Sequence, residues 1–101
     1  MIDLHTVATA NGYKASIMLE EVQLPYRVTS YDLVKGEHFT PAFLALNPVG
    51  RLPTIVDHDV MADGKPLAVY GTMAILVYLA EKTGQLLPDS GAARAKIFEW
   101  L

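Results

Sequence analysis

The feature that most constrains the fold is a strand–helix–strand pattern at the start of the chain. Residues 2–7 (IDLHTV) alternate apolar and polar side chains, which is typical of a half-buried strand. Residues 26–31 (YRVTSY) predict a second strand, because they are rich in β-branched side chains. Between them, helical spacing predicts one buried stripe, formed by Ala15, Met18, Leu19 and Val22. A helix packed on one face makes the two strands parallel, so the pattern predicts a right-handed βαβ unit.

The ends of this helix carry their own signals. Asn11 is predicted to cap its start, since the side-chain carbonyl can accept a hydrogen bond from an unpaired backbone N–H. The helix is predicted to end near Leu24, because the residue before Pro25 is disfavoured in helical backbone. Thr9 and Asn11 thus stand at a strand–helix junction. From these residues alone, a cap at Asn11 and a strand end at Thr9 remain alternatives to a binding role.

The next part of the chain predicts a loop, a short helix and a hairpin. Thr40 and Pro41 form an N-cap and first-turn pair that opens a helix over residues 41–46 (PAFLAL), which Asn47-Pro48 closes. Residues 53–58 (PTIVDH) and 65–70 (KPLAVY) predict two antiparallel strands, because Asp63-Gly64 between them is a turn signal.

A strong helical pattern follows over residues 73–83 (MAILVYLAEKT), with Thr72 as its predicted cap and Gly84 as its stop. The whole order is βαβαββα. Met18, Met73 and Tyr78 stand at helical spacing and are predicted to belong to the core.

The last residues form a further helical pattern. Residues 91–101 carry an apolar stripe of Ala93, Ile97, Trp100 and Leu101, with no stop signal after it. Either the chain belongs to a longer one or this stripe packs on a partner, and we expect the former.

Composition excludes several classes of function. The 101 residues suffice for one modest core, and a net charge of −3 argues against nucleic acid as a partner. No signal peptide is evident, and the longest apolar stretch is too short to span a bilayer. The absence of cysteine excludes a thiol of the protein as nucleophile or metal ligand and fits a cytoplasmic location. We expect no metal site at Asp57, His58 and Asp59, because the side chains of consecutive strand residues point to alternate faces of the sheet.

The predicted element order, with a proline at the head of the third strand, resembles the thioredoxin-like domain of glutathione S-transferases. The segments TANGYK, NPVGRLPTIVD and AILVYLAEK make the match closer. They are similar to the N-terminal domain of bacterial transferases related to the yeast prion-forming nitrogen regulator. The resemblance implies a four-stranded mixed sheet in the order 2-1-3-4 over residues 1–84. It also implies that residues 85–101 are a linker and the first helix of an all-helical C-terminal domain.

The resemblance assigns Thr9 and Asn11 as catalytic residues beside the sulfur of glutathione. Thioredoxins place a Cys-x-x-Cys motif at this junction, because a helix N-terminus stabilises a thiolate. Here the hydroxyl and the amide would instead stabilise a thiolate that glutathione brings. A lowered thiol pKa makes a nucleophile near neutral pH.

The resemblance also assigns glutathione-binding residues in the following loops. It implies a cis Leu52-Pro53 bond, which leaves the backbone of Leu52 free to pair with the cysteine residue of glutathione. Unaided, the sequence favours a trans bond at the start of a strand. Arg51 and His38 are matched to the glycine end of the peptide. A lone histidine in a polar loop is more often simply solvated.

Residues 71 and 72 depart from the family pattern. Relatives have an acidic residue followed by serine here, binding the ammonium and carboxylate of the γ-glutamyl group. This chain has Gly71 and Thr72. Thr72 can keep the serine's role or serve only as a cap, whereas Gly71 offers the ammonium no side chain. Losing one charge-assisted contact costs about 1.5–3 kcal/mol.

The resemblance therefore implies an enzyme that uses glutathione as co-substrate, without a metal. It would conjugate the thiol to electrophiles or reduce disulfides and peroxides, acting as a homodimer. The alternative is a non-enzymatic interaction module that keeps the fold and has lost tight glutathione binding. A thiol oxidoreductase of the thioredoxin type is excluded, because the chain has no cysteine.

Overall fold

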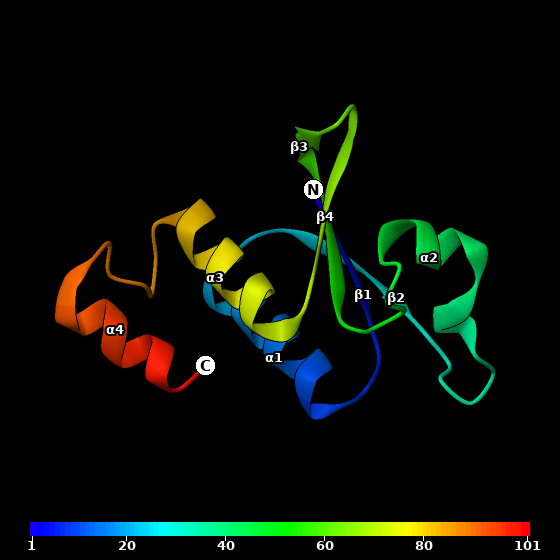
Figure 1. Ribbon diagram of the computed structural model, residues 1–101, viewed down its shortest axis with the longest axis horizontal. Helices are drawn as coiled ribbons and strands as arrows, with labels where there is room; N and C mark the ends of the chain where they lie inside the picture. The colour runs from blue at the N-terminus through cyan, green and yellow to red at the C-terminus, as the bar shows by residue number, and fades with distance from the viewer.

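The computed structural model describes residues 1–101 and contains one sheet with helices on both faces (Figure 1). The strands are β1 (Ile2–Thr6), β2 (Tyr26–Ser30), β3 (Thr54–Ala62) and β4 (Lys65–Tyr70). The helices are α1 (Ala10–Glu21), α2 (Pro41–Leu46), α3 (Thr72–Thr83) and α4 (Gly91–Glu99), with a 3₁₀ turn η1 (Glu37–Phe39) before α2. The predicted order of elements is confirmed.

The sheet has the spatial order β2-β1-β3-β4, as predicted. β1 pairs with β2 in parallel, which confirms the βαβ unit, and β3 is antiparallel to both β1 and β4. The Leu52-Pro53 bond before β3 is cis, as the resemblance implied. The fold is therefore the thioredoxin-like class of mixed α/β sheet.

The main core lies between the sheet and the helix pair α1 and α3. The alternation along β1 explains why, since Ile2 and Leu4 are buried on one face while Asp3 and His5 point to the other. The core side chains are Ile2, Leu4, Ala15, Leu19, Ile55, Ile75 and Leu79. Figure 1 shows α1 and α3 together on this side and α2 on the opposite side of the strands.

A smaller aromatic cluster holds α2 on the second face. The ring of Phe43, which is buried, lies 5.0 Å from that of Tyr31 and 6.0 Å from that of His5, measured between centroids. His5 Nδ1 and the Tyr31 hydroxyl are 2.8 Å apart and share a hydrogen bond. Burial lowers the pKa of His5 and raises that of Tyr31.

The start of α1 corrects the predicted cap. Thr9, not Asn11, is the N-cap: its backbone is extended and its Oγ1 accepts a hydrogen bond from the N–H of Gly12. Asn11 already lies inside the first turn. Gly12 is buried against the end of β1, where a Cβ atom would lie 2.1 Å from the carbonyl oxygen of Val7. The helix therefore approaches the strand as closely as only glycine permits.

The start of α3 corrects a second cap. Thr72 is the first helical residue, and the N-cap is Gly71, which has no side chain to cap with. Gly71 has a φ of 92°, a region that side-chain-bearing residues rarely adopt. At the other end, Gly84 stops the helix in a left-handed conformation, as predicted.

The hairpin β3–β4 is longer than predicted on its first strand. β3 continues beyond residue 58 to Ala62, because Met61 and Ala62 pair with Pro66 and Lys65 after an irregularity in the register. The predicted turn is confirmed, since Asp63 and Gly64 both have positive φ. The hairpin extends past the rest of the sheet (Figure 1).

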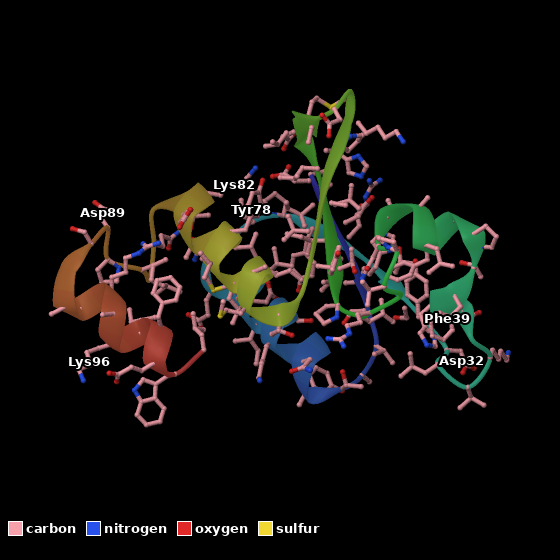
Figure 2. The ribbon with its side chains drawn as sticks, viewed as in Figure 1. Asp32, Phe39, Tyr78, Lys82, Asp89 and Lys96 are labelled. Carbon is pink, nitrogen blue, oxygen red and sulfur yellow. The ribbon has the colours of Figure 1, made fainter.

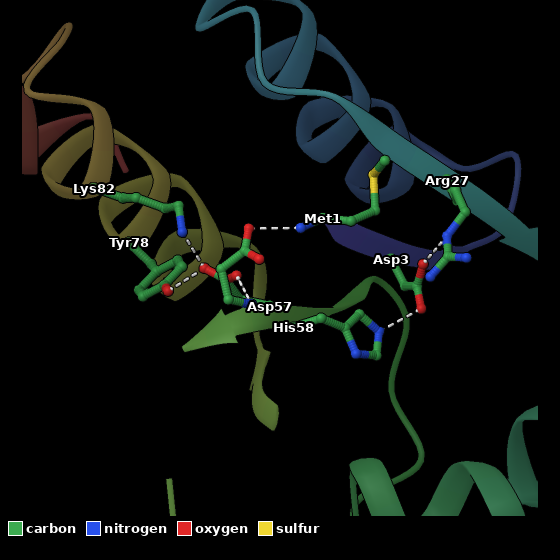
Figure 3. Close-up of polar contacts among 8 residues, drawn as sticks. Met1, Asp3, Arg27, Asp57, His58, Tyr78 and Lys82 are labelled. Atoms are coloured by element: carbon green, nitrogen blue, oxygen red, sulfur yellow. Dashed lines mark hydrogen bonds and ion pairs between the residues drawn. The ribbon is translucent and has the colours of Figure 1, made fainter. Parts of the chain in front are cut away.

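A buried carboxylate ties β3 to α3. Asp57 is fully buried, and its Oδ2 accepts hydrogen bonds from the Tyr78 hydroxyl and the Lys82 ammonium (Figure 3). Burial alone would raise the pKa of Asp57, but hydrogen bonds from Lys82, Tyr78 and the Asp59 N–H outweigh it and lower the pKa. Burial and the neighbouring carboxylate raise the pKa of Tyr78.

Helix α4 lies at one end of the long axis, and Lys96 within it and Asp89 just before it are far from Phe39 and Asp32 (Figure 2). The predicted stripe does not form one covered face. Ile97 and Leu101 line an apolar cleft of about 140 Å³ against α1 and α3, whereas Trp100 is 89% exposed. Ala93 is also exposed, because α4 touches the rest of the chain along one narrow line of residues.

Of the three Met and Tyr residues predicted to belong to the core, two are confirmed. Met18 and Tyr78 pack against the core cluster, but Met73 is 51% exposed. None of the helices has the length and apolar character needed to cross a membrane.

Candidate functional site

The sheet register gathers the predicted site segments at one end of the sheet. In β1, His5 pairs with Thr54 of β3, and Thr54 pairs with Tyr70 of β4. The segments after β1, before β3 and after β4 therefore leave the sheet at the same edge. They carry Thr9 and Asn11, then Arg51, Leu52 and Pro53, then Gly71 and Thr72. β2 ends at this edge too, because Ser30 pairs with Thr6, and the loop bearing His38 follows.

Asn11 and Thr72 line one pocket. It has a volume of about 380 Å³ between the first turns of α1 and α3 and the end of α4. The lining side chains are Asn11, Lys14, Thr72, Met73, Leu76, Trp100 and Leu101. Two polar groups at helix starts thus face an apolar wall. The other predicted residues do not line this pocket.

The O–H of Thr9 is free to donate a hydrogen bond. Its Oγ1 accepts the Gly12 N–H at 3.3 Å, and that bond uses only the acceptor capacity of the oxygen. Thr9 is exposed, so the O–H can point to a ligand while the cap stays in place. Capping and binding are therefore compatible at this residue.

Asn11 is exposed in the first turn of α1, and its Oδ1 accepts a hydrogen bond from Lys14 Nζ at 3.4 Å. Its Nδ2 donates to no group of the chain. The amide of Asn11 therefore has two donors available at the pocket.

The backbone of Leu52 has unpaired polar groups. Its N–H and C=O make no hydrogen bond within the chain, although Pro53 next to it is buried. A peptide in extended conformation could pair with both groups.

A buried asparagine holds the segment just before Leu52. Asn47 Nδ2 donates to the carbonyl oxygen of Arg51 at 2.8 Å, and the Thr54 hydroxyl donates to the same oxygen at 2.9 Å. The Oδ1 of Asn47 accepts from the N–H of Val49 at 2.9 Å. The polar groups of this side chain are thus used to shape the loop.

His38 lies beside this loop. Its ring contacts the tilted ring of Phe39, with centroids 3.9 Å apart, and its Nδ1 is buried without a hydrogen-bond partner. The carbonyl oxygen of His38 lies against Gly50, where a Cβ atom would be 3.2 Å away. The histidine is therefore close to the backbone that leads to Arg51, which is itself exposed.

The first turn of α3 presents unpaired backbone donors. The Ile75 N–H is the first in this helix to find a partner, the carbonyl oxygen of Gly71, so the N–H groups of Thr72, Met73 and Ala74 are free. No side chain caps them. The half-buried Thr72 adds a hydroxyl at the same place.

The three residues that could suggest a metal have separate partners. Asp57 binds Tyr78 and Lys82, His58 pairs with Asp3 at 2.7 Å, and Asp59 pairs with the chain's N-terminal amine at 2.6 Å (Figure 3). No group of three His, Cys, Asp or Glu side chains is arranged to hold an ion.

Two residues of this region were not predicted from the sequence. The sequence pattern places Asn47 only at the end of α2 and indicates no role for Lys14. The i, i+3 spacing of Asn11 and Lys14 in the predicted helix would have pointed to their contact. Nothing local to Asn47 indicates its bond to Arg51, which depends on how the loop folds back.

Comparison with known proteins places the chain in a family. Residues 10–82 match the family model "Glutathione S-transferase, N-terminal domain". The chain is 46% identical over 101 residues to the disulfide-bond oxidoreductase YfcG of Escherichia coli, covering all of this chain and 47% of that protein. It is 38% identical over 97 residues to the protein URE2 of Candida glabrata, covering 90% of this chain and 26% of that protein.

Comparison with solved structures gives the same family. A glutathione transferase family member from Pseudomonas fluorescens, with two glutathione molecules bound, has a TM-score of 0.87 and 42% identity. The match covers 98% of this chain and 43% of that one. A homologue from Lodderomyces elongisporus, also with two glutathione molecules per subunit, has a TM-score of 0.90 and 41% identity, covering 98% and 47%.

This chain spans less than half the length of those relatives. The family model nevertheless covers the candidate site from Asn11 in the first turn of α1 to Thr72 in the first turn of α3, and Thr9 lies just before it. The chain belongs to the glutathione S-transferase family and contains its N-terminal domain.

Proposed function

We propose that this chain binds glutathione and stabilises its thiolate as a nucleophile, acting as the glutathione-binding domain of a transferase. The observation that carries the proposal is the pocket shared by Asn11 and Thr72, which begin two different helices. Helix N-termini favour negative charge, and glutathione carries two carboxylates besides its thiol. The glutathione in the solved relatives from Pseudomonas fluorescens and Lodderomyces elongisporus supports the same ligand here.

Thr9 and Asn11 are proposed to bind the sulfur. The O–H of Thr9 and the Nδ2 hydrogens of Asn11 are donors without a partner in the chain. A hydrogen bond to a charged acceptor is worth about 1.5–3 kcal/mol. Two such bonds would lower the pKa of the thiol and provide a nucleophile near neutral pH.

The rest of the peptide is proposed to bind along the same edge. The unpaired N–H and C=O of Leu52 would pair with the cysteine residue of glutathione, and Pro53 would support that backbone. Arg51 and His38, beside Gly50, would meet the glycine carboxylate. Gly71 and Thr72 would receive the γ-glutamyl carboxylate, because the free N–H groups of α3 begin there.

The proposed reactions are conjugation of the thiol to an electrophile, or reduction of a disulfide or peroxide. The activity named for the relative in Escherichia coli favours disulfide reduction. Because this chain has no cysteine, two glutathione molecules would supply both electrons. The first thiolate attacks one sulfur of the disulfide and expels the other as a thiolate. The second attacks the mixed disulfide, releasing the reduced thiol and glutathione disulfide.

The test combines binding with thiol chemistry. Calorimetric titration should show that the protein binds glutathione, and Asn11→Ala should lower turnover while leaving the melting temperature nearly unchanged, because Thr9 is the cap. Thr9→Val should lower both, and Thr9→Ser, which keeps the hydroxyl, is the matched control. Equal turnover in wild type, Asn11→Ala and Thr9→Val would refute the catalytic roles. Comparing rates with an electrophile and with a disulfide distinguishes the two reactions.

Gly71 favours a second candidate, an interaction module that has lost tight glutathione binding. A residue without a side chain leaves the γ-glutamyl ammonium without a carboxylate at this position. One lost charge-assisted contact weakens affinity by roughly ten- to a hundredfold. Millimolar or weaker binding, with no turnover of any thiol acceptor, would favour the module over the enzyme.

The proposal extends to the assembly. Residues 1–84 would form the glutathione-binding domain, and residues 85–101 would lead into an all-helical domain, since the relatives are more than twice as long. The exposed Trp100 and the apolar cleft beside α4 suit such a contact. A homodimer and a reducing, cytoplasmic compartment complete the proposal, and sedimentation velocity of the intact protein tests the dimer.

A further inference from the structure

Lys14 is the one charged side chain among those that line the pocket of Asn11 and Thr72. It stands three residues after Asn11 on the same face of α1, and its Nζ donates to Asn11 Oδ1 at 3.4 Å. No carboxylate lies within ion-pair distance of its ammonium. The pocket therefore contains a positive charge that the chain does not neutralise.

The contact fixes which way the amide of Asn11 points. An ammonium only donates hydrogen bonds, so the atom of Asn11 that faces Lys14 must be the carbonyl oxygen. The NH₂ group, on the other branch of the planar amide, then points away from the oxygen that Lys14 contacts. A cation on the carbonyl oxygen also polarises the amide and strengthens its N–H donors, as happens in chains of hydrogen bonds.

We propose that Lys14 is a positioning residue that orients the Asn11 amide toward a bound thiolate and favours the charged form of that thiol. The proposal rests on the proposed glutathione binding, and it adds a residue that acts through Asn11. Two effects contribute: the amide presents its donors, and an unpaired positive charge in the pocket favours an anion nearby.

The experiment measures the pKa of the glutathione thiol bound to the protein, from the ultraviolet absorbance of the thiolate against pH. Lys14→Met should raise that pKa by about half a unit to one unit, which lowers the ratio of thiolate to thiol roughly three- to tenfold at a given pH. Lys14→Arg keeps the charge and the donor, so it should restore most of the wild-type value. Lys65→Met removes an equal charge from the remote end of the hairpin and should change nothing.

A double variant tests whether Lys14 acts through Asn11. In an Asn11→Ala background, Lys14→Met should raise the thiol pKa by much less than it does in the wild-type chain. Equal effects in both backgrounds would overturn the positioning role. So would an unchanged thiol pKa in Lys14→Met with glutathione bound.

The failure of the proposed function gives a different result. If calorimetry detects no glutathione binding to the wild-type chain, both proposals fall. If glutathione binds and only the Lys14 variants behave like wild type, the proposed function stands and the inference about Lys14 falls. Circular dichroism of each variant establishes that it is folded, which is expected because Lys14 is exposed.

Discussion

The side chain of Asn47 donates a hydrogen bond of 2.8 Å to the carbonyl oxygen of Arg51 and so sets the course of the loop that precedes β3. Asn47 is fully buried, and its oxygen is used by the N–H of Val49. The exposed side chain of Arg51 and the free backbone groups of Leu52 therefore depend on an interior residue that touches no ligand.

Asn47→Ala should destabilise the chain and weaken glutathione binding together. The substitution removes the acceptor of the Val49 N–H and one donor to the Arg51 carbonyl oxygen, and each lost hydrogen bond costs about 0.5–1.5 kcal/mol. Urea denaturation followed by calorimetric titration under folded conditions measures both effects. Asn47→Asp keeps the acceptor for Val49 but sets a carboxylate against the Arg51 carbonyl, so it should be at least as harmful. A stable Asn47→Ala variant with unchanged affinity would contradict this role.

Gly71→Glu should lower stability while tightening glutathione binding. Position alone predicts that this substitution is nearly free, because an acidic side chain at a helix start interacts favourably with the helix dipole. The φ of 92° corrects that expectation, since a side chain in this backbone region costs about 1–3 kcal/mol. The space itself is open, with only the Ala74 Cβ within 4.0 Å. The melting temperature and the calorimetric affinity should move in opposite senses.

Gly71→Ala is the matched control for that substitution. It adds the same backbone strain without a carboxylate, so its melting temperature should fall while its affinity for glutathione stays at the wild-type level. An affinity of Gly71→Glu no better than that of Gly71→Ala means that the γ-glutamyl ammonium lies elsewhere.

Lys82→Met should cost about 3 kcal/mol of unfolding free energy, the lower end of the range for removing one partner of a buried ion pair. The carboxylate of Asp57 would stay buried with Tyr78 as its remaining side-chain donor, while Lys82 is itself 24% exposed. Lys96→Met breaks an exposed pair with Glu99 and should cost less than about 0.5 kcal/mol. Chemical denaturation of the two variants side by side measures the difference, and equal losses would contradict it.

The same carboxylate predicts acid sensitivity. Because the folded state lowers the pKa of Asp57, its stabilising contribution is present above the unfolded value of 3.8 and is lost as pH falls through the folded pKa. Stability measured below pH 3.8 should therefore fall less steeply with pH in Asp57→Asn than in wild type. Parallel curves for the two proteins would show that another group dominates.

A second pH dependence should appear near neutrality. Burial lowers the pKa of His5, so the unfolded chain binds a proton that the folded chain does not. The contribution of neutral His5 is fully present above the unfolded value of 6.5 and is lost as pH falls from there toward the folded pKa. Thermal unfolding between pH 7.5 and 5 should be less pH-dependent in His5→Gln than in wild type.

The order of elements could be predicted because it depends on short-range chemistry. Each start, turn or stop signal affects the backbone of only a few neighbouring residues. Examples are Thr40 before Pro41, Asp63-Gly64 between two strands, and Gly84 after an apolar helix. The periodic spacing of apolar residues in β1, α1 and α3 likewise determines which face of each element is buried. The resemblance to the transferases added the sheet order and the cis bond before Pro53, which local pattern alone did not favour.

Only the tertiary structure decided which side chains act together. Thr9 rather than Asn11 caps α1, because the close approach of Gly12 to β1 sets where the first turn begins. Asn11 and Thr72 share a pocket because the register of three strands brings two distant helix starts to one edge. The bonds from Asn47 to Arg51 and from Lys82 to Asp57 are equally non-local. A sequence determines local backbone preference and amphipathic faces, whereas the partners of its polar groups follow only from how the faces pack.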